Sequence, residues 1–198
     1  MTGLYLTSFV SGATIMLLEI LGFRLLPPYF GYSVAVWGAL LGVVLAALAV
    51  GYYAGGALAD RHPRPRTLYL MILVAAGYTL LVLPAHPAML GFAARFGLVP
   101  GASLAALLVL AVPMTALSTV SPILIRLLAG SRSLGSAAGT VYAVSTVGSL
   151  AGTLLASFYL VPTVGTRASL WVAVLTLGFV GAAGFVRSEE VGPARGGA

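Results

Sequence analysis

The chain has 198 residues, of which 60% are hydrophobic and only 7% are charged, and its mean hydropathy is +1.08. Because a soluble domain carries charge on about a quarter of its residues, this composition excludes a water-soluble protein and predicts an all-α integral membrane protein. The formal charge of +6 comes from arginines beside apolar stretches, which indicates membrane topology and argues against nucleic-acid binding. Without cysteine, the chain has no disulfide, thiol nucleophile or thiolate metal site.

Six apolar stretches are long enough to cross a bilayer, whose core needs about 20 residues per helix. Prolines, glycines and charges separate them. We expect spans over residues 4–26, 34–58, 67–83, 103–128, 134–161 and 168–186, within one membrane domain (1–187) followed by a flexible cytoplasmic tail (188–198). The segment 85–101 is expected to be an interfacial loop or a short amphipathic helix. The first stretch lacks a basic leader, so we interpret it as a retained span and not as a signal peptide.

The placement of the arginines predicts the orientation. With both termini in the cytoplasm, the opposite side holds only Arg24, Arg95 and Arg167. The cytoplasmic segments then hold Arg61, Arg64, Arg66, Arg126, Arg132, Arg187 and Arg195. By the positive-inside rule, we expect a multi-pass protein of a bacterial-type inner (plasma) membrane with both termini in the cytoplasm.

The second and fifth stretches share a pattern of glycines four residues apart. The pairs are Gly38 with Gly42 and Gly51 with Gly55 in the second stretch, and Gly135 with Gly139 and Gly148 with Gly152 in the fifth. Small residues at this spacing let helix backbones approach closely in lipid. With three spans per half, the pattern favours two inverted three-helix repeats, as in many secondary transporters. Such pairs also occur by chance in apolar sequence.

Glu19 is the one acidic residue inside an apolar stretch. A carboxylate at membrane depth is costly unless it is paired, hydrated or protonated, so it is a candidate for binding a cation or a proton. The alternative is a structural pair, either with Arg24 or with a backbone group on a neighbouring helix. Arg24 follows five residues later, about 140° around an ideal helix, which strains a direct pair. Arg24 could instead extend toward the interface. We weigh the two roles of Glu19 equally and retain both residues as candidate binding residues.

Two later stretches carry polar residues. Ser145, Ser149, Thr153 and Ser157 form a hydroxyl stripe that Tyr142 extends by one turn. The stripe could line a hydrated path, although we favour tight helix packing.

In the fourth stretch Ser118 lies between Pro113 and Pro122, whose backbone breaks are typical of transport sites or of simple curvature. Arg126 shares a helical face with Ser118 and would bring positive charge to the cytoplasmic mouth.

The loop after the second span contains Gly56-x-Leu58-Ala59-Asp60-Arg61, followed by Arg64 and Arg66. This motif resembles the loop after the second helix of Major Facilitator Superfamily transporters, with Pro63 where that family usually has glycine. In that family the acidic residue engages a neighbouring helix end and the basic residues hold one gate state. The resemblance implies that Asp60, Arg61 and Arg64 are gate residues, and Arg126 joins them as a fourth candidate.

A second resemblance covers nearly the whole chain. It rests on Ser11-Gly12, Glu19, Arg24, Trp37-Gly38, Gly55-Gly56 and Asp60-Arg61 in the first half, and on Ser121-Pro122, Gly139-x-x-Tyr142-Ala143, Gly148-Ser149-x-x-Gly152-Thr153 and Pro162-x-x-Gly165-Thr166 in the second. These motifs resemble the membrane domain of spermidine-synthase-like membrane proteins. In fused members a cytoplasmic aminopropyltransferase-like domain follows. Here no such domain follows the sixth span, so we expect no enzyme activity.

Two main functional hypotheses follow. The first is a half-size Major Facilitator-like transporter that works as a homodimer and moves a small cationic solute, with protons as a candidate coupling ion at Glu19. The family resemblance suggests a polyamine. The second is a membrane anchor for a separate soluble aminopropyltransferase. A scaffold without substrate is a third possibility. We expect no cofactor, no nucleic-acid partner and no metal, since His62 and His86 lack companion ligands.

Overall fold

A computed structural model describes residues 2–130 and 133–190 of the chain. Within these ranges every regular element is helical, so the all-α prediction is confirmed. Five helical stretches are long and apolar enough to cross a membrane, as expected for a multi-pass membrane protein. These are Gly3–Phe30, Val34–Arg61, Pro65–Phe96, Leu98–Leu128 and Leu134–Ser188.

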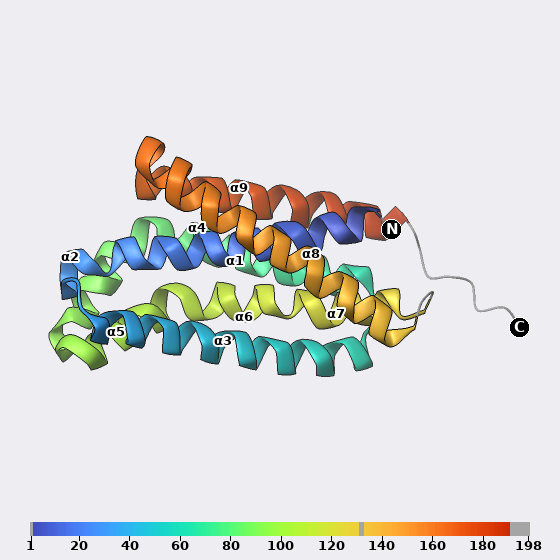
Figure 1. Ribbon diagram of the computed structural model, residues 1–198, viewed down its shortest axis with the longest axis horizontal. Helices are drawn as coiled ribbons and strands as arrows, with labels where there is room; N and C mark the ends of the chain where they lie inside the picture. Colours follow the sequence, from blue (N-terminus) through green and yellow to red (C-terminus); the bar gives the residue numbers. More distant parts are fainter. Residues whose placement is uncertain (1, 131–132, 191–198) are drawn as a thin grey trace, which may run out of the picture.

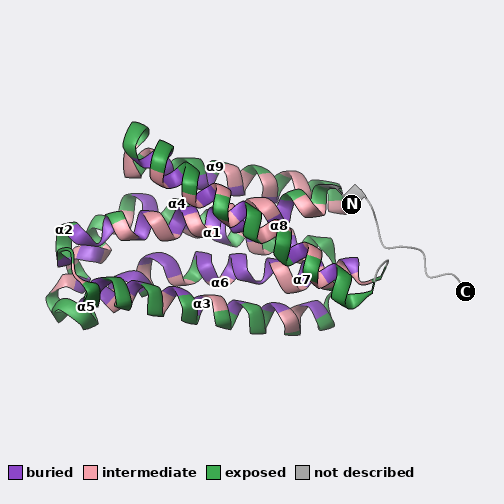
Figure 2. Ribbon diagram, in the orientation of Figure 1, coloured by how far each residue is buried: buried purple, intermediate pink, exposed green. Residues whose placement is uncertain are grey.

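The helices form an elongated bundle in which α1 begins and α9 ends at the same end (Figure 1). They are α1 (Thr2–Leu25), the short α2 (Pro27–Phe30), α3 (Val34–Arg61), α4 (Pro65–Ala93), α5 (Leu98–Ala106), α6 (Val112–Ser118), α7 (Val120–Leu128), α8 (Leu134–Leu155) and α9 (Val161–Glu190). A 3₁₀ turn (Ala94–Phe96) precedes α5, and π-helical turns lead into α6 (Leu107–Ala111) and α9 (Ala156–Leu160). Buried residues line the inner faces of the bundle (Figure 2).

The third span does not end before the prolines, which corrects the prediction for 67–83 and for 85–101. Helix α4 continues to Ala93 with Pro84 and Pro87 inside it. A proline removes the backbone N–H that would bond the carbonyl four residues earlier, and for Pro87 that carbonyl belongs to Leu83. The ring of His86 donates from Nδ1 to this same oxygen at 2.8 Å. The side chain thus replaces the bond that Pro87 cannot make, and the helix continues.

The fourth predicted span (103–128) corresponds to the run from α5 to α7. Before Pro113 the chain adopts a π turn, in which bonds reach back five residues. Pro113 cannot donate to the fifth residue back, Leu108, and the hydroxyl of Tyr78 on α4 donates to the Leu108 carbonyl oxygen at 2.6 Å. The freed carbonyl therefore has a partner inside the protein, as lipid surroundings require.

The fifth and sixth predicted spans follow one another without a loop and are separated by a kink at Gly165, whose backbone angles are non-helical (φ 80°, ψ 169°). By length and composition Leu134–Ser188 is one apolar stretch, so its division into two spans stays a prediction. Helix α9 extends to Glu190, beyond the predicted domain end at 187. The remainder of the predicted tail, 191–198, lies outside the described residues, as do Arg132 and Arg195 of the topology argument.

Helices α1 and α8 pack along one another through two of the predicted glycines. A methyl group added at Gly148 would overlap the backbone carbonyl of Phe9, and one added at Gly152 would overlap that of Ala13. The two helices are therefore in backbone contact over a full turn. Small residues make such an approach possible in a membrane, where lipid offers no hydrophobic drive for association.

Helix α3 packs on α6 and α7 through the corresponding glycines of the second stretch. A methyl group at Gly51 would overlap the carbonyl of Thr115, and one at Gly55 would meet the backbone of Thr119. In both interfaces, two glycines four residues apart lie against two backbone groups four residues apart. The other predicted pairs differ, because a methyl group at Gly38, Gly42, Gly135 or Gly139 would meet nothing within 4 Å.

We predict that Gly152→Ala destabilises the fold whereas Gly139→Ala does not. The new methyl at position 152 overlaps the carbonyl of Ala13, and such overpacking costs about 1–3 kcal/mol. At position 139 the space is open, and alanine favours a helix by up to about 1 kcal/mol over glycine. Thermal unfolding of both variants in the same detergent checks this, and equal midpoints would contradict the packing at Gly152.

Candidate functional site

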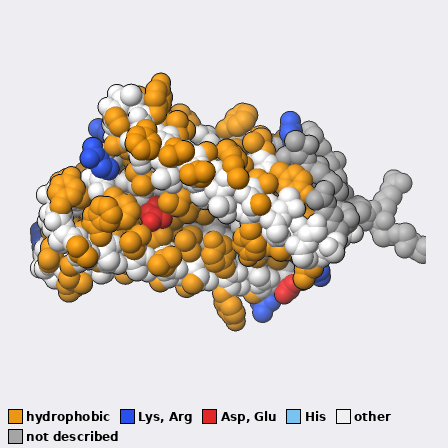
Figure 3. All heavy atoms as spheres, in the orientation of Figure 1, with side chains coloured by type: hydrophobic (Ala, Val, Ile, Leu, Met, Phe, Trp, Pro, Cys, Tyr) orange, Lys and Arg blue, Asp and Glu red, His pale blue; other side chains and the backbone are white. Residues whose placement is uncertain are grey.

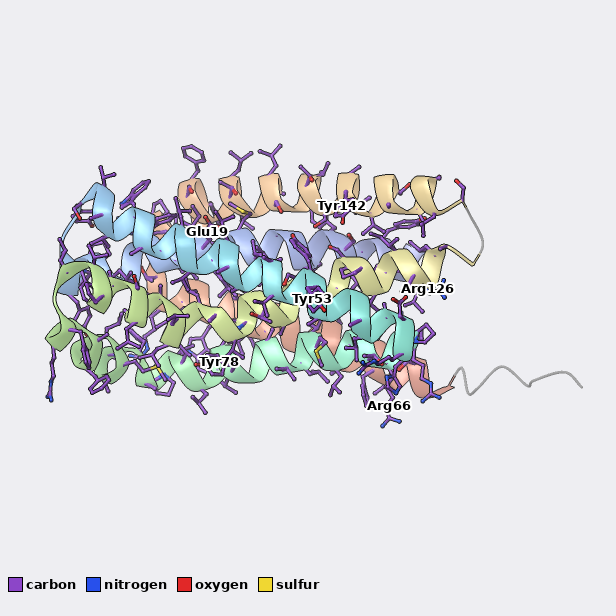
Figure 4. All side chains as sticks on the ribbon, turned by 90° about the horizontal axis from the view of Figure 1, so that it is seen from below. Glu19, Tyr53, Arg66, Tyr78, Arg126 and Tyr142 are labelled. Carbon is purple, nitrogen blue, oxygen red and sulfur yellow. The ribbon has the colours of Figure 1, made fainter. Side chains whose placement is uncertain are left out.

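On one face of the bundle α3 and α8 do not meet, and we call the strip of α1 between them the groove. Helix α8 packs on α1, α3 packs mainly on α5, α6 and α7, and the described residues of α3 and α8 make no substantial contact with each other. Helix α1 lies between them (Figure 4). Figure 3 shows an acidic side chain among hydrophobic ones on the face turned to the viewer.

Glu19 lies in this groove, on α1 between α8 and α3 (Figure 4). Its side chain is half-buried. In the described part of the chain no arginine or histidine nitrogen lies within 4.0 Å of its carboxylate. Arg24 is exposed at the end of α1, so the structural ion pair considered from the sequence is not formed with it. Glu19 is therefore a half-buried carboxyl group that no cation of the described residues neutralises.

An aromatic pair borders the Glu19 region on the side of α2. The rings of Phe23 on α1 and Trp37 on α3 lie with their centroids 4.6 Å apart. Phe23 is one helical turn after Glu19, and Glu19 is six residues, about 9 Å, before the end of α1 at Leu25. The aromatic pair therefore lies between the carboxylate and that end of the bundle.

Tyrosines occupy the other part of the groove. Tyr142 is about half exposed and lies on the side of α8 that faces α3 (Figure 4). Tyr52 on α3 is close enough for the two phenols to interact electrostatically. Tyr52 was not among the residues predicted from the sequence. It could have been noticed there as a polar aromatic residue inside a largely apolar span.

Tyr142 and Glu19 are well separated along the groove. The hydroxyl of Ser8 donates to the carbonyl oxygen of Val141 at 3.1 Å, which places Tyr142 near the level of Ser8. Eleven residues separate Ser8 from Glu19 on α1, a rise of about 16 Å. The two candidate residues therefore do not bind one atom together, although they lie along the same groove.

The serines of α8 lie in its contact with α1. A methyl group at Gly12 would overlap the backbone carbonyl of Ser145, and the hydroxyl of Ser149 donates to the Gly12 carbonyl oxygen at 3.2 Å. The hydroxyl of Thr153 donates to the carbonyl of Ser149 at 2.9 Å. Ser149 and Thr153 therefore use their protons on backbone oxygens, which is the packing role that the sequence analysis favoured for the stripe.

Ser118 lies apart from the other candidates. It is fully buried on α6 against Gly51, and its hydroxyl donates to the carbonyl oxygen of Thr115 at 3.0 Å. The neighbouring Thr115 donates across to the carbonyl of Ala47 on α3 at 3.2 Å. The structure thus places Ser118 in the α3–α6 contact, and it does not bring Ser118 together with Glu19.

The four candidate gate residues gather where α3, α4 and α7 meet. Arg126 Nε lies 3.9 Å from Asp60 Oδ1, and the two side chains are 55% and 79% exposed. So exposed a pair contributes less than about 1 kcal/mol. Arg61 and Arg64 are exposed at the same α3–α4 connection. Asp60 thus lies beside an arginine in the last turn of α7 of its own chain.

No family model, curated protein or solved structure matches this chain. Both family resemblances therefore stay predictions. Among the described residues no group of three His, Asp or Glu side chains could hold a metal ion.

We predict that the groove is reached by water whereas the surface of α9 faces lipid. Because the chain has no cysteine, Tyr142→Cys and Phe179→Cys each introduce a single thiol at an exposed position. Maleimides react with the thiolate, which forms in water and not in hydrocarbon. A charged, membrane-impermeant maleimide should label Cys at 142 at least about tenfold faster than at 179 in proteoliposomes. Equal labelling rates would contradict a hydrated groove.

Proposed function

We propose that this chain is one half of a Major Facilitator-like transporter, which works as a homodimer and moves a small cationic solute. The observation that carries the proposal is Glu19, a half-buried carboxylate that no cation of the described residues contacts, in a groove between two helices that do not close over it. A carboxylate in this position attracts a cation, and an open groove gives the cation a route.

The proposed topology has six spans in a bacterial-type inner membrane, with both termini in the cytoplasm. The run Leu134–Ser188 has 55 residues and would be roughly 80 Å long as one straight helix, far more than a bilayer core. The non-helical backbone at Gly165 supports a division there into two crossings. Basic residues outside the apolar stretches then follow the positive-inside rule.

The glycine contacts support two inverted three-helix repeats. The second span packs on the fourth through Gly51 and Gly55, and the fifth span packs on the first through Gly148 and Gly152. If spans one to three correspond to spans four to six, the contact of span two with span four corresponds to the contact of span five with span one. The third and sixth spans, α4 and α9, pack on each other. This pattern is the one expected if spans one to three and four to six are copies of one unit.

A second copy of the chain would complete the site. A six-helix half leaves the groove between α3 and α8 open along its length, so Glu19 would face lipid in a monomer. Two copies related by a twofold axis would place two grooves, and two carboxylates, around one cavity. Two separated carboxylates suit an elongated cation with two positive groups, and polyamines are the first class to test. Glu19 is also the group through which protons would couple.

Two buried hydroxyls on α1 bear on the presence of water inside the bundle. The hydroxyls of Tyr5 and Ser11 on α1 are buried without a hydrogen-bond partner among the described residues. Buried hydroxyls nearly always have a partner, and ordered water commonly supplies it.

We predict that Glu19→Gln lowers cation uptake into proteoliposomes by at least tenfold, because glutamine keeps the shape of the side chain and loses its charge. Glu19→Asp, which keeps the charge, is the matched control and should retain more uptake than Gln. Thermal midpoints within a few degrees of the parent protein would show that both variants fold. Full uptake by Glu19→Gln would rule out this role.

We also predict a dimer in lipid. After the mass of lipid, scaffold or detergent is subtracted, the protein in each particle is expected to have twice the 20.2 kDa mass of one chain. A strictly monomeric particle that still transports would contradict the half-transporter arrangement. A particle without flux that copurifies with a soluble aminopropyltransferase would instead favour the anchor hypothesis, for which the exposed Arg61 and Arg64 offer a docking surface.

A further inference from the structure

A second hollow opens between α3, α4 and α6, and Glu19 and Tyr142 are not among its lining residues. We call it the side crevice. Its volume is about 390 Å³, within the roughly 300–1,000 Å³ typical of small-molecule sites. Its walls include Ala54 and Leu58 from α3 and Met71 and Val74 from α4. The π turn before Pro113 contributes Ala111 to the floor.

The side crevice is apolar although two threonines line it. The hydroxyl of Thr115 donates to the carbonyl of Ala47 at 3.2 Å, and that of Thr119 donates to the carbonyl of Ala116 at 2.7 Å. With their protons used on backbone oxygens, both threonines contribute mainly methyl surface to the lining. A polar solute would find few partners here, whereas a hydrocarbon chain would lose nothing by entering.

The elements that line the side crevice carry arginines at one end of the bundle. Along α3 and α7, seven residues, close to two helical turns, separate Arg61 from Ala54 and Arg126 from Thr119. Arg64 lies at the same end, just before the first residue of α4, Pro65. The rise over seven residues is about 10 Å, so the arginines form a rim just beyond the apolar walls.

The rim is positively charged. Arg61 and Arg64 are exposed, and Arg126 is 55% exposed beside Asp60. Among the side chains that the structure describes at this rim, three guanidinium groups accompany one carboxylate, that of Asp60, which leaves an excess of positive charge. Arg66 is directed elsewhere, with its guanidinium carbon 4.7 Å from the centre of the Phe185 ring on α9. Figure 4 shows Arg66 and Arg126 at separate places on this end of the bundle.

We propose that the side crevice binds an anionic phospholipid, with one acyl chain between α3, α4 and α6 and the phosphate at the rim of Arg61, Arg64 and Arg126. Basic pockets between membrane helices take anionic lipid headgroups in this way. The apolar walls account for the chain, and the charged rim about 10 Å away accounts for the headgroup. The site requires only that this end of the bundle faces a leaflet, so it is independent of the proposed transport.

The test is lipid retention by the delipidated full chain, measured by native mass spectrometry in micelles that contain phosphatidylglycerol or phosphatidylcholine. We expect one phosphatidylglycerol to bind at least about tenfold more tightly than phosphatidylcholine. Arg61→Gln combined with Arg64→Gln should weaken that binding by roughly 30-fold. The matched control is Arg95→Gln, an exposed arginine in the 3₁₀ turn at the opposite end, which should leave binding unchanged.

A second pair of variants tests the acyl-chain part of the site. Ala54→Phe fills the side crevice and should reduce phosphatidylglycerol binding at least about tenfold. Ala57→Phe, also exposed on α3 but outside the lining, should not. Equal retention of the two lipids would overturn the proposal, as would equal effects of the two variants in either pair. Competition by inorganic phosphate as effective as by phosphatidylglycerol would also overturn it, because phosphate has no chain for the crevice.

Glu19→Gln should bind phosphatidylglycerol like the parent protein. The transport proposal and the lipid-binding proposal can therefore fail separately. Cation uptake can be lost while lipid binding persists, and lipid binding can be lost while uptake persists.

Discussion

Within a bilayer the backbone can find its hydrogen-bond partners only inside the protein, and the fold described here depends on that constraint. At two prolines that remove backbone donors, Pro87 and Pro113, a side chain compensates. The His86 ring bonds the Leu83 carbonyl within α4, and the Tyr78 hydroxyl reaches from α4 to the Leu108 carbonyl. The second of these bonds also joins two helices. The irregular turn before Pro113 is thereby held by its neighbour, and the side crevice forms next to it.

Close backbone contact is the second requirement, and it explains where the groove lies. The glycines of α8 hold it against α1, and those of α3 hold it against α6 and α7. Because α3 and α8 are each drawn to a different inner helix, they do not meet, and the face between them stays open. Glu19 faces this opening because it is on α1, which lies between the two. The position of Glu19 follows from helix packing. Its carboxylate is not in an ion pair with any arginine or histidine that the structure describes.

Much of the architecture could be predicted from local patterns, because apolar length alone identifies segments that cross a membrane. The features that were missed depend on residues far apart in the chain. Nothing local indicates that Tyr78 completes the turn at Leu108, that Asp60 meets Arg126, or that Tyr52 lies near Tyr142. The glycine spacing predicted close contacts but could not show which pairs make them, since Gly38 and Gly42 have the same spacing as Gly51 and Gly55 yet lie against open space. At Pro87 the continuation of α4 is accompanied by one imidazole that acts as a donor to a backbone carbonyl.

The exposed pair between Asp60 and Arg126 has a consequence for the balance between conformations. An interaction below about 1 kcal/mol changes an equilibrium constant by no more than about fivefold. The side chains of Asp60 and Arg126 can therefore separate under ordinary thermal agitation while the helices stay packed, and dissolved salt weakens the attraction further. Such a contact sets a mild preference between neighbouring arrangements of the two side chains, and their populations respond to ionic strength.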